Sequence, residues 1–117
     1  MNRRNLKVTL HLYQIRVYQS AGRQEPFTEW LERLADRQAR ARIRARLDRI
    51  ALGNLGDCRS VGKGVSELRI NWGPGYRVYF ARVGSVVLLL LCGGDKTTQQ
   101  KDIQHAQTYL QDYQSRL

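Results

Sequence analysis

The hydrophobic pattern changes its period partway along the chain, and that change most limits what this sequence can fold into. Between residues 26 and 50 the apolar residues recur at helical spacing, as at Phe27, Trp30, Leu31 and Leu34. From Val65 onward they alternate with polar residues, which is the period of a strand. Helices followed by a run of consecutive strands are typical of the α+β class. We therefore expect an α+β fold.

The strand pattern also assigns side chains to faces. Leu68 and Ile70 fall on one face of their strand, and Glu67 and Arg69 on the other. The segment Trp72-Gly73-Pro74-Gly75 predicts a tight reversal, so the next strand is expected to run antiparallel. The last run is apolar on both faces, which is typical of a central strand covered on both sides. Strands are expected over residues 13–17, 65–70, 76–80 and 86–92, and a turn is expected around Cys58.

Helix boundaries are marked by local signals. Pro26 suits the first position of one helix, and Asp36 can end that helix and cap the next. Gly53-Asn54 predicts the end of the second helix. Thr97-Thr98-Gln99-Gln100 matches a capping box that would open the last helix. Apolar stripes are expected on the second helix at Ala39, Ile43, Leu47 and Ile50, and on the last at Ile103, Ala106, Leu110 and Tyr113.

With 117 residues the chain is long enough for one domain, expected over residues 13–117. Residues 1–12 form a basic leader with too few apolar residues for a signal peptide, and no run is long enough to cross a bilayer. Cys58 and Cys92 have no partners at metal-ligand spacing, so we interpret both as free thiols in a reducing cytoplasm. We expect no metal, no cofactor and no membrane partner.

The charge balance points to an anionic partner. Lys and Arg number 20 against 10 Asp and Glu, a formal net charge of +10, and 16 of the 20 cations are arginine. Arginine forks match phosphate and carboxylate groups, so phosphate is the first expectation. The helix after Asp36 carries six arginines, which form either a solvated face with pairs such as Arg44 to Asp48 or a docking face for RNA or an acidic protein.

A second cationic group is expected on the sheet. If the hairpin is symmetric about Gly73, Arg69 and Arg77 lie opposite or diagonal to each other, and two like charges so placed need an anion nearby. That anion is either Glu67, as a structural ion pair, or a substrate phosphate. Lys96 precedes the expected helix cap at Thr97, where the positive end of the helix would add to its charge.

An ordered series of motifs resembles a known group of proteins. The matching segments are Gly53-Asn54-Leu55-Gly56-Asp57, Gly64-Val65-Ser66-Glu67-Leu68-Arg69, Gly73-Pro74-Gly75-Tyr76-Arg77-Val78-Tyr79 and Gly93-Gly94-Asp95-Lys96-Thr97-Thr98-Gln99. With these segments, residues 13–113 resemble the addiction-module killer proteins of the HigB-like branch of the RelE/ParE toxin superfamily. Residues 1–12 are extra relative to the usual start of that family, as a tail or an early start codon.

The resemblance implies a fold with a small antiparallel-dominated sheet, an N-terminal helical hairpin and a C-terminal helix. It also implies a toxin that cleaves mRNA on the ribosome by attack of a 2′-hydroxyl on the adjacent phosphate, and that a small helix-turn-helix antitoxin neutralises. Arg77 would stabilise the phosphorane. The other residues that the resemblance brings in are Arg69, Lys96 and Tyr79 near the catalytic cleft, with Lys63 as an RNA contact. Further RNA contacts are expected from the arginine-rich helix, at Arg40 and Arg44, and from the expected cap at Thr97.

Two other functions stay open at this stage. A gyrase-poisoning toxin of the ParE type shares the same fold, and fold alone does not fix function. A basic nucleic-acid-binding module without activity would carry the same charge. His11 and His105 lie in the leader and on the last helix, so no histidine pair is placed for acid–base catalysis, and the sequence names no general acid or base.

Overall fold

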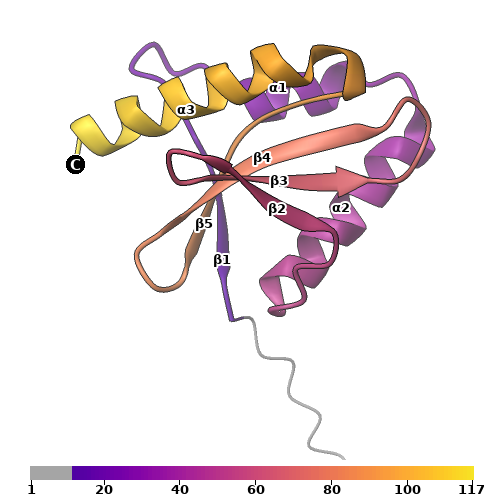
Figure 1. Cartoon of the computed structure of the whole chain (residues 1–117), viewed down its shortest axis with the longest axis horizontal. Coiled ribbons are helices and arrows are strands. Elements are labelled where there is room, and N and C mark those ends of the chain that lie inside the picture. The colour runs from indigo at the N-terminus through magenta and orange to yellow at the C-terminus, as the bar shows by residue number, and fades with distance from the viewer. Residues whose placement is uncertain (1–11) are drawn as a thin grey trace, which may run out of the picture.

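One five-stranded sheet with helices on both faces forms the molecule (Figure 1). The structure is a computed structural model that describes residues 12–117, so the expected leader lies, except for Leu12, outside the described residues. The sheet order is β1-β5-β4-β3-β2. The elements are β1 (Gln14–Val17), α1 (Pro26–Arg33), α2 (Arg37–Ala51), β2 (Cys58–Gly62), β3 (Val65–Ile70), β4 (Tyr76–Val83), β5 (Val87–Gly94), the 3-10 helix η1 (Lys96–Thr98) and α3 (Gln99–Ser115).

Strands β2 to β5 form an antiparallel meander, and β1 adds to β5 in parallel. The α+β class, the small antiparallel-dominated sheet and the C-terminal helix are therefore confirmed. The turn expected around Cys58 is wrong, because Cys58 begins β2 and pairs with Leu68. This edge strand is short, mostly polar and interrupted by a bulge between Ser60 and Gly62, so it lacks the alternation that marks the other strands.

Helices α1 and α2 cover one face of the sheet. Pro26 occupies the first turn of α1, and the Asp36 carboxylate accepts hydrogen bonds from the backbone amides of Gln38 and Ala39 to cap α2, both as expected. The two helices pack against different strands, α1 against β5 and α2 against β1 and β3. Their shared core joins buried side chains of α1, α2 and the strands: Phe27, Leu31, Ile43, Ile50, Leu68, Ile70, Val78, Phe80, Leu88 and Leu90.

Helix α3 covers the other face, where Ala106 and Leu110 pack on β3, β4 and β5. Two adjacent glycines at the end of β5 allow helices to approach from both sides. A Cβ at Gly93 would overlap the ring of Trp30 in α1, and a Cβ at Gly94 would overlap the carboxylate of Asp102 in α3. The expectation that this strand is covered on both faces is thus confirmed, and no helix of the described residues could cross a membrane.

Candidate active site

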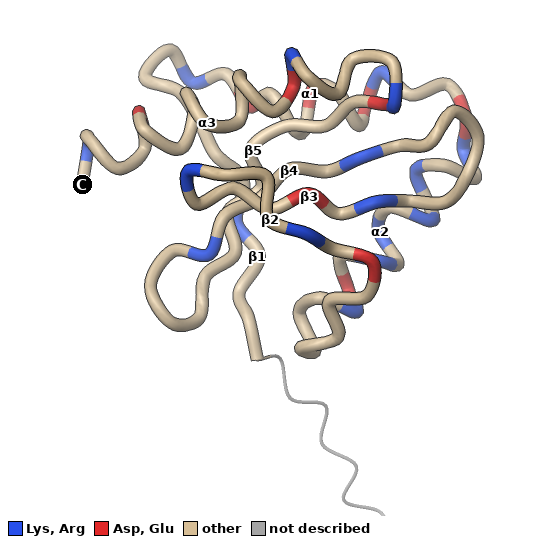
Figure 2. The backbone as a smooth tube through the Cα atoms, viewed as in Figure 1, with Lys and Arg blue, Asp and Glu red and all other residues tan. Residues whose placement is uncertain are grey.

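The cationic residues predicted on the sheet meet in one cleft. Arg69 and Arg77 are register partners on β3 and β4, so they lie directly opposite each other. Both line a cavity of about 500 Å³ together with Lys96 from η1. Gly75 lies between Arg77 and Lys96 with a φ of 81°. A Cβ at this position would lie 3.4 Å from Arg77 Nη1 and 3.6 Å from the Lys96 Cβ. Figure 2 shows basic segments of β3 and β4 near the ends of these strands that are joined by the turn between them.

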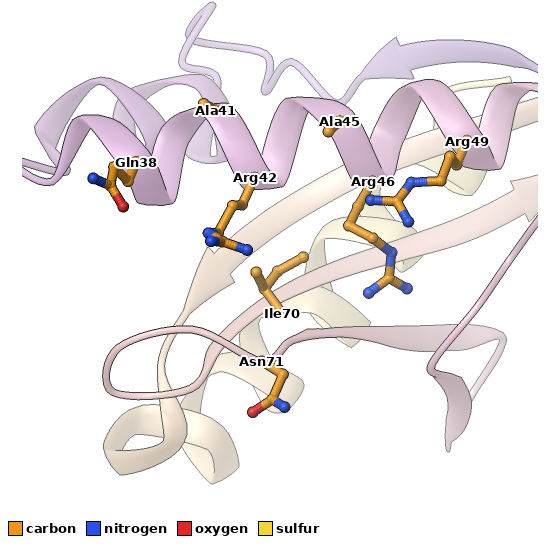
Figure 3. A pocket seen from close by; sticks show the side chains of 8 residues that line it. All are labelled: Gln38, Ala41, Arg42, Ala45, Arg46, Arg49, Ile70 and Asn71. Atoms are coloured by element: carbon orange, nitrogen blue, oxygen red, sulfur yellow. The ribbon is translucent and has the colours of Figure 1, made fainter.

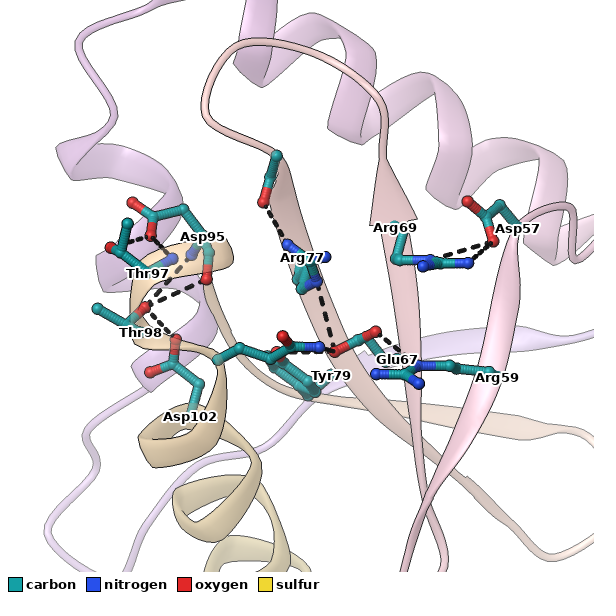
Figure 4. A network of polar contacts seen from close by, with 12 residues as sticks. Asp57, Arg59, Glu67, Arg69, Arg77, Tyr79, Asp95, Thr97, Thr98 and Asp102 are labelled. Carbon is teal, nitrogen blue, oxygen red and sulfur yellow. Dashed lines mark hydrogen bonds and ion pairs between the residues drawn. The ribbon is translucent and has the colours of Figure 1, made fainter.

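Arg77 is held by a buried carboxylate. Glu67 has no exposed surface, and its Oε2 lies 3.5 Å from Arg77 Nε, while Arg77 Nη1 donates to the Gly75 carbonyl at 2.9 Å (Figure 4). Three other groups complete the shell of the carboxylate: Arg59 Nε at 3.0 Å, the Tyr79 hydroxyl at 3.1 Å and Gln99 Nε2 at 2.8 Å. The structural ion pair considered for Glu67 therefore exists, and its partner Arg77 still lines the cleft.

The surroundings of Glu67 favour its charged form. Burial of the carboxylate raises its pKa, but the hydrogen bonds from Gln99, Arg59 and Tyr79 lower it by more. The net pKa therefore lies below the ordinary value for Glu. Burial and the neighbouring Glu67 charge raise the pKa of Tyr79 above its usual range. Glu67 is therefore an anion, and Tyr79 is a neutral hydrogen-bond donor to it.

Arg69 has a different carboxylate. Its Nε and Nη2 donate to Asp57 Oδ1 at 3.2 and 3.0 Å, and the Arg69 amide donates to the Asp57 carbonyl at 3.0 Å. Both side chains are about half exposed, at 44% and 54%. The repulsion between the opposed arginines is thus relieved by two separate carboxylates, and each arginine still borders the cleft.

The expected cap at Thr97 is wrong. Asp95 caps η1 instead, with its Oδ1 accepting from the Thr97 amide at 2.8 Å and the Thr97 hydroxyl at 2.6 Å. Thr98 completes that capping box and donates to Asp102 at 2.5 Å. A carboxylate already occupies this positive helix end, so the attraction for a further anion comes from the Lys96 ammonium. In the sequence, the signal for this cap is Asp95, two residues before Thr97.

The other predicted site residues lie outside the cleft lining. Tyr79 is fully buried. Lys63 lies in the turn between β2 and β3, at the opposite end of β3 from Arg69. Arg40 of α2 donates to the Leu34 carbonyl. Arg44 lies beside a small cavity next to β1, and within residues 12–117 it forms no ion pair with Asp48. Thr97 is exposed beside Lys96.

Three residues that the sequence did not single out also line the cleft. Asp57 enters from the loop before β2, Asn71 from the end of β3 and Tyr76 from the start of β4. Asp57 is the single carboxylate among the residues lining this cleft in the described chain. Only its neighbour in the fold, Arg69, distinguishes Asp57 from other loop aspartates. No group of three or more His, Cys, Asp or Glu within residues 12–117 could hold a metal ion.

Comparison with known proteins places the chain in a family. The model of the phage derived protein Gp49-like family (DUF891) matches residues 29–114, which include α2, the four-stranded meander and most of α3. A protein of Haemophilus influenzae (strain ATCC 51907 / DSM 11121 / KW20 / Rd), described as an uncharacterized protein, is 49% identical over 86 residues, covering 74% of this chain and 87% of that protein. The narrower HigB-like assignment stays a prediction. The chain belongs to the phage-derived Gp49-like family, a toxin-like family related to addiction modules.

Proposed function

We propose that this protein is the toxin of a toxin–antitoxin pair and that it cleaves mRNA in the cleft between β3, β4 and η1. One observation carries the proposal: Arg69, Arg77 and Lys96 converge on a single cavity, and one of them is fixed by a buried carboxylate. Three cations around a cavity of this size fit a phosphodiester, whose charge grows in the transition state of transfer. The family membership supports the toxin role.

In the proposed reaction the 2′-hydroxyl oxygen of RNA attacks the adjacent phosphorus as the bond to the 5′-oxygen breaks. The hydroxyl proton passes to a base, and an acid protonates the departing 5′-oxygen. The products are a 2′,3′-cyclic phosphate and a free 5′-hydroxyl. Arg77 stabilises the extra negative charge on the phosphorane, because its guanidinium is already oriented by Glu67 and the Gly75 carbonyl.

The structure adds candidates for the proton transfers that the sequence left unnamed. Asp57 is the carboxylate that lines the cleft, so we assign it the role of general base. Lys96, exposed at the opposite side of the cleft from β3, is our candidate for contact with the leaving group. Arg69 holds Asp57 and faces the phosphate. Tyr79 acts through Glu67, since its hydroxyl has no access to substrate.

The proposed partners are the ribosome with its mRNA and an acidic antitoxin, and the proposed compartment is the cytoplasm, where those partners meet. Lys63, Arg40, Arg44 and Thr97 stay proposed contacts to RNA outside the cleft. An antitoxin that covers the cleft would have to offer carboxylates to its arginines, because desolvating an arginine without a partner is costly.

The test is induction of the chain in cells without an antitoxin, followed by primer extension on cellular mRNA. New 5′ ends within reading frames, absent with Arg77→Ala, are the expected result. Growth arrest without new ends, accompanied by DNA breaks, would identify the gyrase-poisoning alternative instead. Normal growth with folded protein confirmed would overturn the toxin assignment altogether.

A further inference from the structure

A second basic hollow lies beside the cleft, along α2. It has a volume of about 500 Å³ and lies between one face of α2 and the end of β3 (Figure 3). Gln38, Arg42 and Arg49 are spaced along this face of the helix over eleven residues, or about 16 Å at 1.5 Å per residue. The small side chains of Ala41 and Ala45 leave the floor open. We call this hollow the α2 groove.

The wall of the α2 groove is held in place by Trp72. The Trp72 indole donates to Asp36 Oδ2 at 3.0 Å, and Arg42 Cζ lies 3.9 Å from the centre of its ring. Arg46 ties the helix to β3 through the Arg69 carbonyl at 2.8 Å and to the loop before β2 through the Leu55 carbonyl at 3.1 Å. The groove is therefore a fixed feature of the fold and not an accident of surface side chains.

The α2 groove continues into the catalytic cleft, because Ile70 and Asn71 line both cavities. The groove lining contains three arginines and no carboxylate. We propose that the α2 groove binds the phosphate backbone of the RNA nucleotides that flank the one in the cleft, through Arg42, Arg49 and the amide of Asn71. This inference rests on the proposed function and names the path of the substrate.

RNA is favoured over an acidic protein segment by this continuity. An RNA strand whose scissile phosphate lies between Arg69 and Arg77 would pass Asn71 and reach the arginines of α2. Its successive phosphates would thus meet guanidinium groups in both cavities. Guanidinium forks suit successive phosphate oxygens, and such contacts position a strand without reading its sequence. Arg40 and Arg44, the contacts to RNA predicted on the same helix, do not line this groove.

The test measures binding apart from cleavage. Fluorescence anisotropy with 2′-O-methyl oligoribonucleotides, which lack the attacking hydroxyl, gives Kd for a four-nucleotide and a twelve-nucleotide strand. We expect Arg42→Gln/Arg49→Gln to weaken the longer strand about tenfold or more and to leave the shorter one within about threefold. The salt slope for the longer strand should fall by about 1.4, since each phosphate contact to a single strand contributes about 0.7.

The matched control is Arg16→Gln/Arg33→Gln, which also removes two positive charges, but at exposed positions on β1 and α1 away from the groove. Arg49→Gln alone keeps the stacking of Arg42 on Trp72 and guards against loss of folding. Equal losses in variant and control, or no advantage of the longer strand in the wild type, would overturn the groove while mRNA cleavage in cells upheld the proposed function. Unchanged RNA binding with loss of antitoxin binding would assign the groove to the protein partner instead.

Discussion

The two faces of the sheet are built from alternate residues of the same strands, yet they end differently. On the face under α1 and α2, β3 and β4 present Leu68, Ile70, Val78 and Phe80, all buried. On the face under α3, both strands are apolar at the end away from the turn that joins them and charged at the end next to that turn. Their residues there pair across the strands, from the apolar end to the charged end, as Val65 with Ala81, Glu67 with Tyr79 and Arg69 with Arg77.

The difference teaches where the cleft comes from. Helix α3 covers the first two of these pairs, and the Glu67–Tyr79 pair is the last without exposed surface. Gln99, the first residue of α3, donates to Glu67 and so marks the edge of that cover. The Arg69–Arg77 pair lies just beyond it and lines the cleft. The buried Glu67 carboxylate thus forms an ion pair with Arg77 at the point where α3 stops covering the sheet.

The largest expected effect separates two arginines that share this anion. Arg77→Ala should lower mRNA cleavage about a hundredfold or more, because a lost phosphorane contact of this kind costs about 3 kcal/mol of transition-state stabilisation. Arg59→Ala removes a cation from the same Glu67 but from β2, outside the cleft lining. It should leave cleavage within about threefold. Single-turnover cleavage of RNA on purified ribosomes measures both.

Thermal melting of the same two variants is the control. Both should lose about 1 to 3 kcal/mol of folding free energy, because Arg59→Ala removes a charged hydrogen-bond donor and Arg77→Ala removes an ion-pair partner at 3.5 Å. Each variant leaves the Glu67 carboxylate with its other partners. Equal losses of cleavage in Arg59→Ala and Arg77→Ala, in step with melting, would show that Arg77 is structural only. Arg77→Lys should recover part of the activity, since an ammonium keeps the charge but not the fork.

The next effect concerns Glu67 itself. Glu67→Gln keeps the shape but turns one oxygen into a donor that faces the donors of Arg59, Tyr79 and Gln99. We expect a loss of about 1 to 3 kcal/mol in folding free energy and a fall in kcat with little change in KM, because Arg77 loses its orientation. Chemical denaturation and ribosome cleavage assays measure these. An unchanged kcat would mean that Gly75 alone positions Arg77.

Much of this comparison could be read from the sequence, because alternation and turn position are local. Symmetry about Gly73 predicts that Arg69 and Arg77 lie opposite or diagonal to each other, and the structure makes them direct partners. The need for an anion beside them predicts either Glu67 or a phosphate. The burial of Tyr79 could not be read, since alternation places it with Arg77 but does not say how far α3 extends over the sheet.

Other misses have the same physical origin. Asp57 joins Arg69 through an edge strand too short and irregular to show a period. The α2 groove is lined by Arg42 and Arg49, not by Arg40 or Arg44, because which flank of a helix meets a loop depends on packing between distant segments. Asp95 displaces Thr97 as the cap because several residues near a helix start can accept the first amides, and tertiary contacts select among them.

A smaller effect should appear in the pH dependence of stability that Glu67 contributes. The folded-state pKa of Glu67 lies below its ordinary value, so this group contributes stability that is present above the unfolded pKa of about 4.3 and is lost as pH falls through the folded pKa. Glu67→Gln should therefore unfold with a shallower decline below pH 5 than the wild type. Burial raises the pKa of Asp102, which works in the opposite sense, so only the difference between the two proteins is diagnostic. Parallel curves would contradict an ionised Glu67.

The smallest expected effect is at the far end of β3 from the cleft, where the residues carry no buried charge. Lys63 adopts a φ of 54° in the turn before β3, followed by Gly64 at 83°. Asn tolerates this left-handed conformation better than Lys, and Asn-Gly is the preferred pair in such hairpin turns. Lys63→Asn should therefore raise the free energy of unfolding by about 0.5 kcal/mol, which stabilises the protein. Denaturant midpoints at constant m-value measure the gain, and Lys63→Gln is the control for lost charge. If Lys63→Asn and Lys63→Gln weaken RNA binding equally while only the first gains stability, the strained lysine is kept for contact with RNA. If neither weakens it, the RNA path is confined to the cleft side of the sheet.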